Sequence, residues 1–104
     1  MTREEKEYTE AGQGVKQSEE SQMFGKPCFK IKGKAFMCLF ENCAVFKLGG
    51  DEHADAISLS GAVLFDPSGK GRAMKEWVQL PYKHKGKWPT LAKTAAKYVS
   101  ATAK

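Results

Sequence analysis

The chain is predicted to fold as an α+β two-layer sandwich, in which an antiparallel five-stranded sheet carries helices packed on one face. From Cys28 onward, short apolar or alternating runs follow one another and are separated by glycine-containing or polar turns, which is typical of strands joined by hairpins. Helical spacing of apolar residues appears after Asp51 and after Pro89. With 104 residues, the chain has the size of one domain with one core.

The first 22 residues are rich in Glu, Gln, Ser and Thr and contain few apolar side chains. Such a segment buries too little apolar surface to offset the entropy that it loses on ordering. We therefore expect residues 1–22 to form a polar mobile arm, or a short N-terminal helix from Ser18 to Met23 with Ser18 as its N-cap. Residues 23–104 form the folded domain.

Three strands are expected next, as a meander. The first runs from Cys28 into a turn at residues 32–34, and the second covers the apolar run 35–40. The third runs from Cys43 to Leu48, where Gly49 and Gly50 close it. Lys47 is the one charged residue inside this third strand, so we expect its side chain on the open face of the sheet.

Two further strands and two helices complete the predicted fold. Residues 51–59 form a short helix, with Asp51 as N-cap and Gly61 beyond its end. Residues 62–65 and 73–80 form a hairpin around a turn at 67–69, and Pro81 stops the second strand. The last helix begins at Pro89, whose fixed φ suits a first helical turn, and lies across the sheet.

The positive charge of the chain is concentrated in the predicted domain. The formal net charge is +5, but residues 1–22 carry three basic and six acidic side chains, which leaves +8 on residues 23–104. A field of this sign attracts phosphates, anionic surfaces or acidic proteins, or it serves solubility alone.

The three cysteines, Cys28, Cys38 and Cys43, are odd in number and have no close metal-ligand spacing. The chain also shows no apolar leader segment and no run of roughly 20 apolar residues. We therefore expect a cytoplasmic protein with no membrane partner, whose cysteines are reduced and buried as small hydrophobic residues.

The densest positive charge lies between residues 70 and 87. The candidate binding surface consists of Lys70, Arg72, Lys75, Lys83, Lys85 and Lys87, with Trp77, Tyr82 and Trp88 between them. This composition provides phosphate contacts and base stacking in single-strand nucleic-acid binding. Alternatively, both tryptophans belong to the core and the lysines form a solvated rim.

A secondary basic edge is expected at Lys30, Lys32 and Lys34. Positive side chains along an edge strand also prevent its pairing with another chain.

No catalytic, cofactor or metal site is predicted. His53 and His84 have no nucleophile and orienting carboxylate at recognisable spacing. Asp51, Glu52, His53 and Asp55 do cluster, but they stand at the start of a helix, where capping and the helix dipole account for them.

Several segments follow the order and spacing of a known family. They are Met23-Phe24-Gly25, the apolar hairpin after it, Phe46-Lys47-Leu48, Phe65, and the run from Gly71 to Pro81. Together they resemble the TfoX N-terminal domain family and, more distantly, the YjbR-like proteins. The resemblance implies one sheet with helices on one side and a non-enzymatic role, since the named members are competence regulators thought to assist transcription.

These observations predict a non-enzymatic interaction or regulatory module that binds a protein partner and needs no cofactor. The alternative is a basic nucleic-acid-binding domain, and a small enzyme is the third hypothesis. Steeply salt-dependent affinity would distinguish nucleic-acid binding from protein binding.

Overall fold

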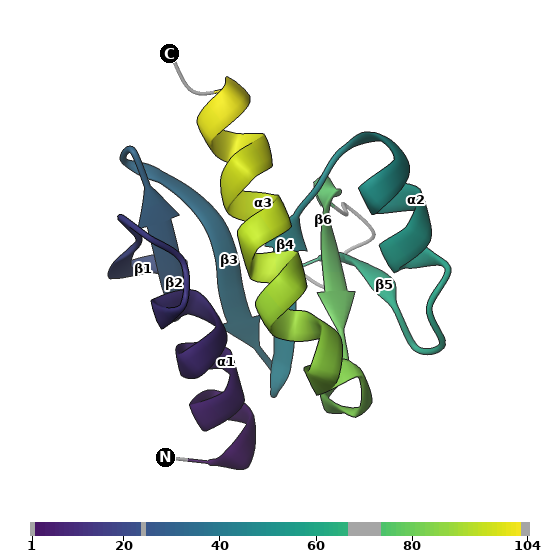
Figure 1. Ribbon diagram of the computed structural model, residues 1–104. Coiled ribbons are helices and arrows are strands. Elements are labelled where there is room, and N and C mark those ends of the chain that lie inside the picture. The colour runs from purple at the N-terminus through teal and green to yellow at the C-terminus, as the bar shows by residue number, and fades with distance from the viewer. Residues whose placement is uncertain (1, 24, 67–73, 103–104) are drawn as a thin grey trace.

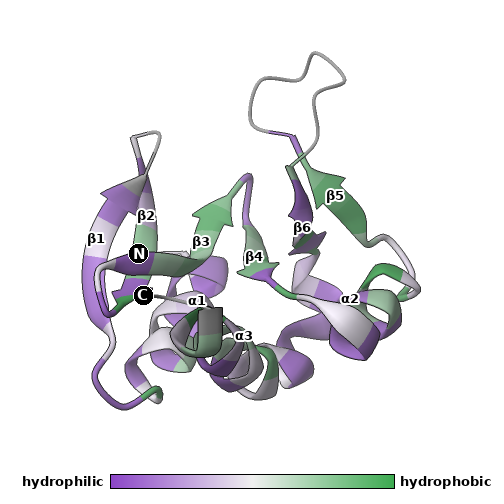
Figure 2. Ribbon diagram, turned by 90° about the horizontal axis from the view of Figure 1, so that it is seen from above, coloured by the Kyte–Doolittle hydropathy of each residue, from purple (hydrophilic) through white to green (hydrophobic). Residues whose placement is uncertain are grey.

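The computed structural model describes residues 2–23, 25–66 and 74–102 (Figure 1). Six strands form one antiparallel sheet in the order β1-β2-β3-β4-β6-β5. Helices α1 (Arg3–Gln13), α2 (Gly50–Ile57) and α3 (Trp88–Thr102) lie on one side of this sheet (Figure 2). The predicted α+β sandwich is confirmed, with six strands in place of five.

Strands that are consecutive in the sequence are neighbours in the sheet from β1 to β4, and two tight turns join β2, β3 and β4. The strands are β1 (Glu19–Met23), β2 (Lys26–Ile31), β3 (Lys34–Phe40), β4 (Cys43–Lys47), β5 (Val63–Phe65) and β6 (Met74–Leu80). The β2–β3 turn places Lys32 and Gly33 at positive φ, and the β3–β4 turn does the same with Glu41 and Asn42. Two consecutive residues of positive φ match the right-handed twist of the flanking strands.

The N-terminal region differs from the prediction of a mobile arm. Thr2 and Glu5 form a reciprocal capping box that starts α1 at Arg3. Tyr8 and Ala11 on α1, and Val15 just after it, are buried, and the Tyr8 ring centroid lies 5.3 Å from that of Phe29. Few apolar residues suffice here because their spacing places them on the face that meets the sheet.

The short helix expected over residues 18–23 is also wrong. Residues 19–23 form β1, and all five pair with β2. Ser18 is not a helix N-cap, because its Oγ donates a hydrogen bond to the carbonyl oxygen of Gly12. Backbone pairing with an existing strand outweighs the local preference of a polar segment.

The main core lies between the sheet and the helices, and a bulge in β3 enlarges it. Phe29 pairs with Met37 and Lys30 pairs with Ala35, so Phe36 is one residue too many for a regular ladder. Both Phe36 and Met37 are therefore buried in the helix-side cluster, together with Phe46 and Trp88.

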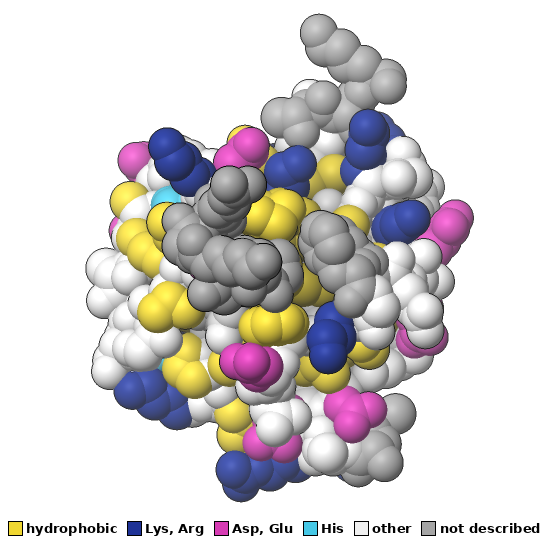
Figure 3. Space-filling model, turned by 180° about the vertical axis from the view of Figure 1, so that it is seen from behind, with side chains coloured by type: hydrophobic (Ala, Val, Ile, Leu, Met, Phe, Trp, Pro, Cys, Tyr) yellow, Lys and Arg dark blue, Asp and Glu magenta, His cyan; other side chains and the backbone are white. Residues whose placement is uncertain are grey.

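A second apolar cluster lies on the other face of the sheet, which carries no helix among the described elements. Its buried members are Cys28, Cys38, Val45, Phe65 and Trp77. The Phe40 ring packs edge-on against Phe65 with a centroid separation of 5.1 Å. Figure 3 shows hydrophobic side chains across the middle of this face, with charged side chains mostly around them.

Strand alternation also puts Lys47 on this helix-free face, because Lys47 stands opposite Trp77 and two residues from Val45. The predicted orientation of Lys47 is confirmed. Within the described ranges, no helix combines the length and apolar character that crossing a membrane requires.

We predict that Gly12→Ala destabilises the fold, although alanine normally favours a helix. A Cβ at Gly12 would lie 2.3 Å from Cε2 of the Phe29 ring, so the ring and α1 must move apart. Overpacking of this kind costs about 1–3 kcal/mol, which urea denaturation would measure.

Gly14→Ala is the matched control. A Cβ there meets its nearest neighbour, the Glu10 carbonyl oxygen, at 3.5 Å, and the backbone is already right-handed at φ −73°. We expect a change in unfolding free energy within about 1 kcal/mol for this control. Equal unfolding midpoints for the two variants would contradict the close approach of Gly12 to Phe29.

Candidate binding groove

The described members of the predicted basic surface do not form one continuous site. Lys70 and Arg72 lie outside the described residues, as do all of residues 71–73, the first part of the run to Pro81 that contributes to the family resemblance. Lys75 stands at the beginning of β6, whereas Lys83, Lys85 and Lys87 belong to the 3₁₀ helix η1 (Tyr82–Lys87) beyond its end. Almost the whole of β6 therefore separates Lys75 from the other three.

Lys85 of η1 lies instead beside Tyr82, together with a residue that the sequence analysis missed. Arg3 Cζ lies 4.5 Å from the centre of the Tyr82 ring, and Lys85 Nζ lies 4.9 Å from it. Lys85 Nζ also donates a hydrogen bond of 3.2 Å to the Tyr82 hydroxyl. No local signal links Arg3 to Tyr82, because only the packing of α1 beside α3 brings them together.

The tryptophans do not offer stacking surfaces. Trp77 is 6% exposed in the helix-free cluster, and Trp88 is fully buried at the start of α3. The alternative in which both tryptophans are core residues is confirmed, which leaves the half-buried Tyr82 as the aromatic ring beside the lysines of η1.

The prediction of a secondary basic edge is wrong as well. Lys30, Lys32 and Lys34 lie at the β2–β3 hairpin, but β2 is not an edge strand because β1 pairs with it. Lys30 stands opposite Glu19 of β1. The outer strand at this side of the sheet is therefore acidic, with Glu19 and Glu20 in place of the lysines.

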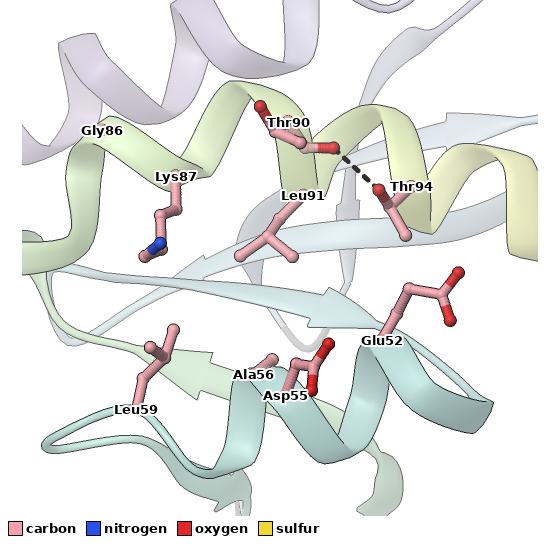
Figure 4. A pocket seen from close by; sticks show the side chains of 9 residues that line it. All are labelled: Glu52, Asp55, Ala56, Leu59, Gly86, Lys87, Thr90, Leu91 and Thr94. Carbon is pink, nitrogen blue, oxygen red and sulfur yellow. Dashed lines mark hydrogen bonds between the residues drawn. The ribbon is translucent and has the colours of Figure 1, made fainter.

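A groove lies between α2 and the segment that joins η1 to α3. It encloses about 480 Å³ and is lined by Glu52, Asp55, Ala56, Leu59, Gly86, Lys87, Thr90, Leu91 and Thr94. Figure 4 shows Leu91 and Lys87 reaching from one wall toward α2, and Leu59 reaching from the end of α2 toward them. Ala56 is buried, while the carboxylates of Glu52 and Asp55 belong to exposed residues along α2.

The groove continues along α3 into a second hollow of about 320 Å³, which shares Glu52 and Thr94 with the first. Gly49, Lys97, Tyr98 and Ala101 complete this second part. A Cβ at Gly49 would meet the Tyr98 ring at 2.5 Å, so glycine is required for the approach of Tyr98 to the β4–α2 connection. The Tyr98 hydroxyl donates a 2.5 Å hydrogen bond to Glu76 Oε2 of β6.

Hydrogen bonds to the sheet and to η1 hold the walls of the groove in place. His53 Nε2 lies 2.7 Å from the carbonyl oxygen of Lys75, which ties α2 to β6. His84 Nε2 lies 2.7 Å from the Ser60 carbonyl oxygen, and Lys83 Nζ donates to Ser60 Oγ at 2.7 Å. These two hydrogen bonds hold the segment after α2 against η1. They thereby fix the width of the groove at the end where Leu59 and Lys87 lie.

Asp51 is not the N-cap that the sequence predicted. Gly49 occupies the N-cap position without a side-chain hydrogen bond, and Asp51 and Glu52 lie in the first turn of α2. Two carboxylates in this turn interact favourably with the helix dipole. Among residues 2–23, 25–66 and 74–102, no group of three or more His, Cys, Asp or Glu side chains is arranged to hold a metal ion.

The thiols lie away from the groove. Cys28 and Cys38 are buried and Cys43 is half-buried, and all three are free. Burial raises the pKa of each thiol, in the case of Cys38 to about 12. The burial of Cys28 and Cys38 agrees with the expectation that they pack as small hydrophobic residues.

Comparison with protein-family models found no match, and comparisons with curated proteins and with solved structures found none either. The resemblance to the TfoX N-terminal family therefore stays a prediction.

The Tyr98–Glu76 hydrogen bond generates a prediction of pH dependence. The bond to Glu76 raises the pKa of Tyr98, and burial adds to this shift. A raised pKa in the folded state means that the stabilisation is complete below the unfolded value of roughly 10 and is lost as the pH rises through the folded value. Tyr98→Phe should therefore cost about 1 kcal/mol at neutral pH and progressively less above about pH 10.

Urea denaturation of both proteins across this pH range is the measurement. In a Glu76→Gln background, the same Tyr98→Phe substitution should cost less at neutral pH, because the charged acceptor is gone. A cost that stays constant with pH in the wild-type background would disprove the linkage.

Proposed function

We propose that this protein is a non-enzymatic interaction module that binds an extended segment of a partner protein in the groove between α2 and α3. The observation that carries the proposal is the apolar floor of Ala56, Leu59 and Leu91 between an acidic wall and a basic end. A binding site with this design buries an apolar side chain centrally and uses charged groups at its rim for orientation.

The dimensions favour a short peptide segment over a compact metabolite. The two parts of the groove follow the end of η1 and then α3, from Gly86 to Ala101. A helix of that length extends about 22 Å, which an extended chain covers with roughly six or seven residues. The groove is open along this length, as suits a chain that enters and leaves at its two ends.

The charges indicate what the partner segment carries. Glu52 and Asp55 form the acidic wall on α2, whereas Lys87 and Lys97 stand toward the two ends on the α3 side. A bound segment complements this pattern with an apolar side chain on Leu59 and Leu91 and a Lys or Arg beside it that faces the acidic wall. The peptide carbonyl groups and an acidic residue at either end meet the two lysines.

The proposal is tested by selecting heptapeptides from a random display library and measuring their affinity by fluorescence anisotropy. Selected peptides should pair an apolar residue with a basic one, and Leu91→Ala should weaken them about tenfold. Asp55→Lys should weaken the same peptides through charge repulsion.

Lys93→Ala is the matched control, because Lys93 is an exposed residue of α3 outside the lining of both parts of the groove. Its affinity should equal that of the wild type. Peptides that bind all three variants equally, or a selection that yields no binder, would refute the proposed groove.

A second candidate function, nucleic-acid binding, is favoured by Arg3 and Lys85, which both lie against the Tyr82 ring. Arg3 is paired with Glu4 at 3.3 Å, which reduces the net charge of this cluster. The burial of both tryptophans also removes two of the three stacking side chains on which the sequence-based hypothesis depended.

Titration of labelled single- and double-stranded oligonucleotides at about 50 and 200 mM salt separates the two functions. Three phosphate contacts would make affinity fall by roughly tenfold or more over this range, and neutralising Lys83, Lys85 and Lys87 to Gln would abolish the salt dependence. We expect no saturable binding at the lower salt concentration. Tight, salt-sensitive binding would instead favour the nucleic-acid function.

A further inference from the structure

Two of the free cysteines face each other directly across neighbouring strands. Cys28 of β2 and Cys38 of β3 are Cα partners in the antiparallel ladder, and both belong to the cluster on the helix-free face. Directly opposed residues in such a ladder have Cα atoms about 4.5–5.5 Å apart. Disulfides span Cα separations of about 4.4–6.8 Å, so the backbone already has the geometry that a bond between these thiols needs.

The bulge at Phe36 creates this pairing. Ile31 and Lys34 are partners beside the turn, and a regular ladder continued from them would put Cys28 opposite Met37. The extra residue shifts the register by one, so that Cys28 meets Cys38 and both side chains leave the sheet on the same face.

The two thiols differ in their surroundings. Cys28 belongs to the lining of a pocket of about 340 Å³ between α1 and the β1–β2 pair, together with Thr9, Gln13, Glu20 and Ser21. Cys38 is absent from this lining and sits deeper in the apolar cluster. The pocket lies on the helix side of the sheet, whereas the Cys28 side chain lies in the cluster on the opposite face, and both thiols are 1% exposed.

The groups around Cys28 also favour its thiolate relative to that of Cys38. Burial raises the pKa of Cys28, but Lys30 and a hydrogen bond from Ser21 oppose this shift, while Glu20 on the same pocket wall is held by Gln13 at 3.1 Å. Burial and the neighbouring Cys28 raise the pKa of Cys38 to about 12, with no opposing group. Cys28 is thus the more reactive thiol of the pair.

We propose that Cys28 and Cys38 form a peroxide-sensitive pair, in which Cys28 is oxidised first and Cys38 then closes a disulfide across β2 and β3. The Cys28 thiolate attacks one oxygen of hydrogen peroxide, the O–O bond breaks, and the departing hydroxide takes up the thiol proton to leave as water. Cys28 is then a sulfenic acid. The Cys38 sulfur attacks the Cys28 sulfur, the S–O bond breaks, and a second water leaves with the Cys38 proton.

Two thiols and one hydrogen peroxide thus give one disulfide and two waters. The product pins the bulged register of the β2–β3 hairpin, because slipping by one residue would require the new bond to break. Burial of both sulfur atoms slows the reaction, and it also shields the finished disulfide from reducing thiols. We therefore expect the disulfide, once formed, to be reduced slowly.

The test treats the folded, fully reduced chain with hydrogen peroxide, blocks remaining thiols with iodoacetamide, and maps the peptides under non-reducing conditions. Trypsin cuts between Cys28 and Cys38 at the lysines of the hairpin, and a glutamyl endopeptidase cuts at Glu41 between Cys38 and Cys43. We expect a linked peptide pair that contains Cys28 and Cys38, with Cys43 alkylated. The oxidised protein should also unfold at a higher urea concentration than the reduced one.

Three variants sharpen the result. Cys43→Ser should leave the linkage and the shift in the urea midpoint unchanged, whereas Cys38→Ser should leave Cys28 as a sulfenic acid that dimedone traps. Ser21→Ala should slow the reaction by about threefold to tenfold, because the thiolate loses a hydrogen bond. A linkage that includes Cys43, oxidation of Cys28 to the sulfinic acid without any linkage, or a folded protein inert to peroxide would each overturn the proposal.

Discussion

The structure depends above all on the burial of Trp88 at the point where η1 becomes α3. Trp88 is the largest fully buried side chain among the described residues, and the Tyr82 ring stands edge-on to it at 5.9 Å. Burying an indole removes about 150–250 Å² from water, so this one contact anchors the first turn of α3 on the sheet. From there α3 crosses β2, β3 and β4 and packs beside α1 (Figure 1).

The groove follows from that anchor. Once α3 is fixed at Trp88, the face of α3 that contains Leu91 and Thr94 is held toward α2, while Ala92 and Ala95 turn into the core. These small alanine side chains let α3 lie close to the sheet. The open space is therefore the groove between α3 and α2, and among the described residues none is left between α3 and the sheet. Carboxylates, an ammonium group and hydroxyls stand around the apolar floor of this groove.

Sequence reasoning found the elements with strong local patterns and missed those that depend on pairing. Alternation and turn residues located β2 to β6, α2 and α3 within a few residues, whereas β1 has no apolar pattern and becomes a strand only because β2 accepts it. The basic residues were correctly identified as a group in the sequence, but no local signal shows that Lys75 lies beyond β6 from Lys83. Likewise, the opposition of Cys28 and Cys38 depends on a one-residue bulge that hydrophobic spacing does not reveal.

The two outer strands differ in a way that limits assembly. At one side β1 presents Glu19 and Glu20, and at the other the three-residue β5 presents Val63, which is 51% exposed. Endless strand-by-strand growth needs a donor edge and an acceptor edge on every copy, and the acidic β1 repels a second copy of itself. The carboxylates of β1 thus disfavour pairing of two copies through this strand.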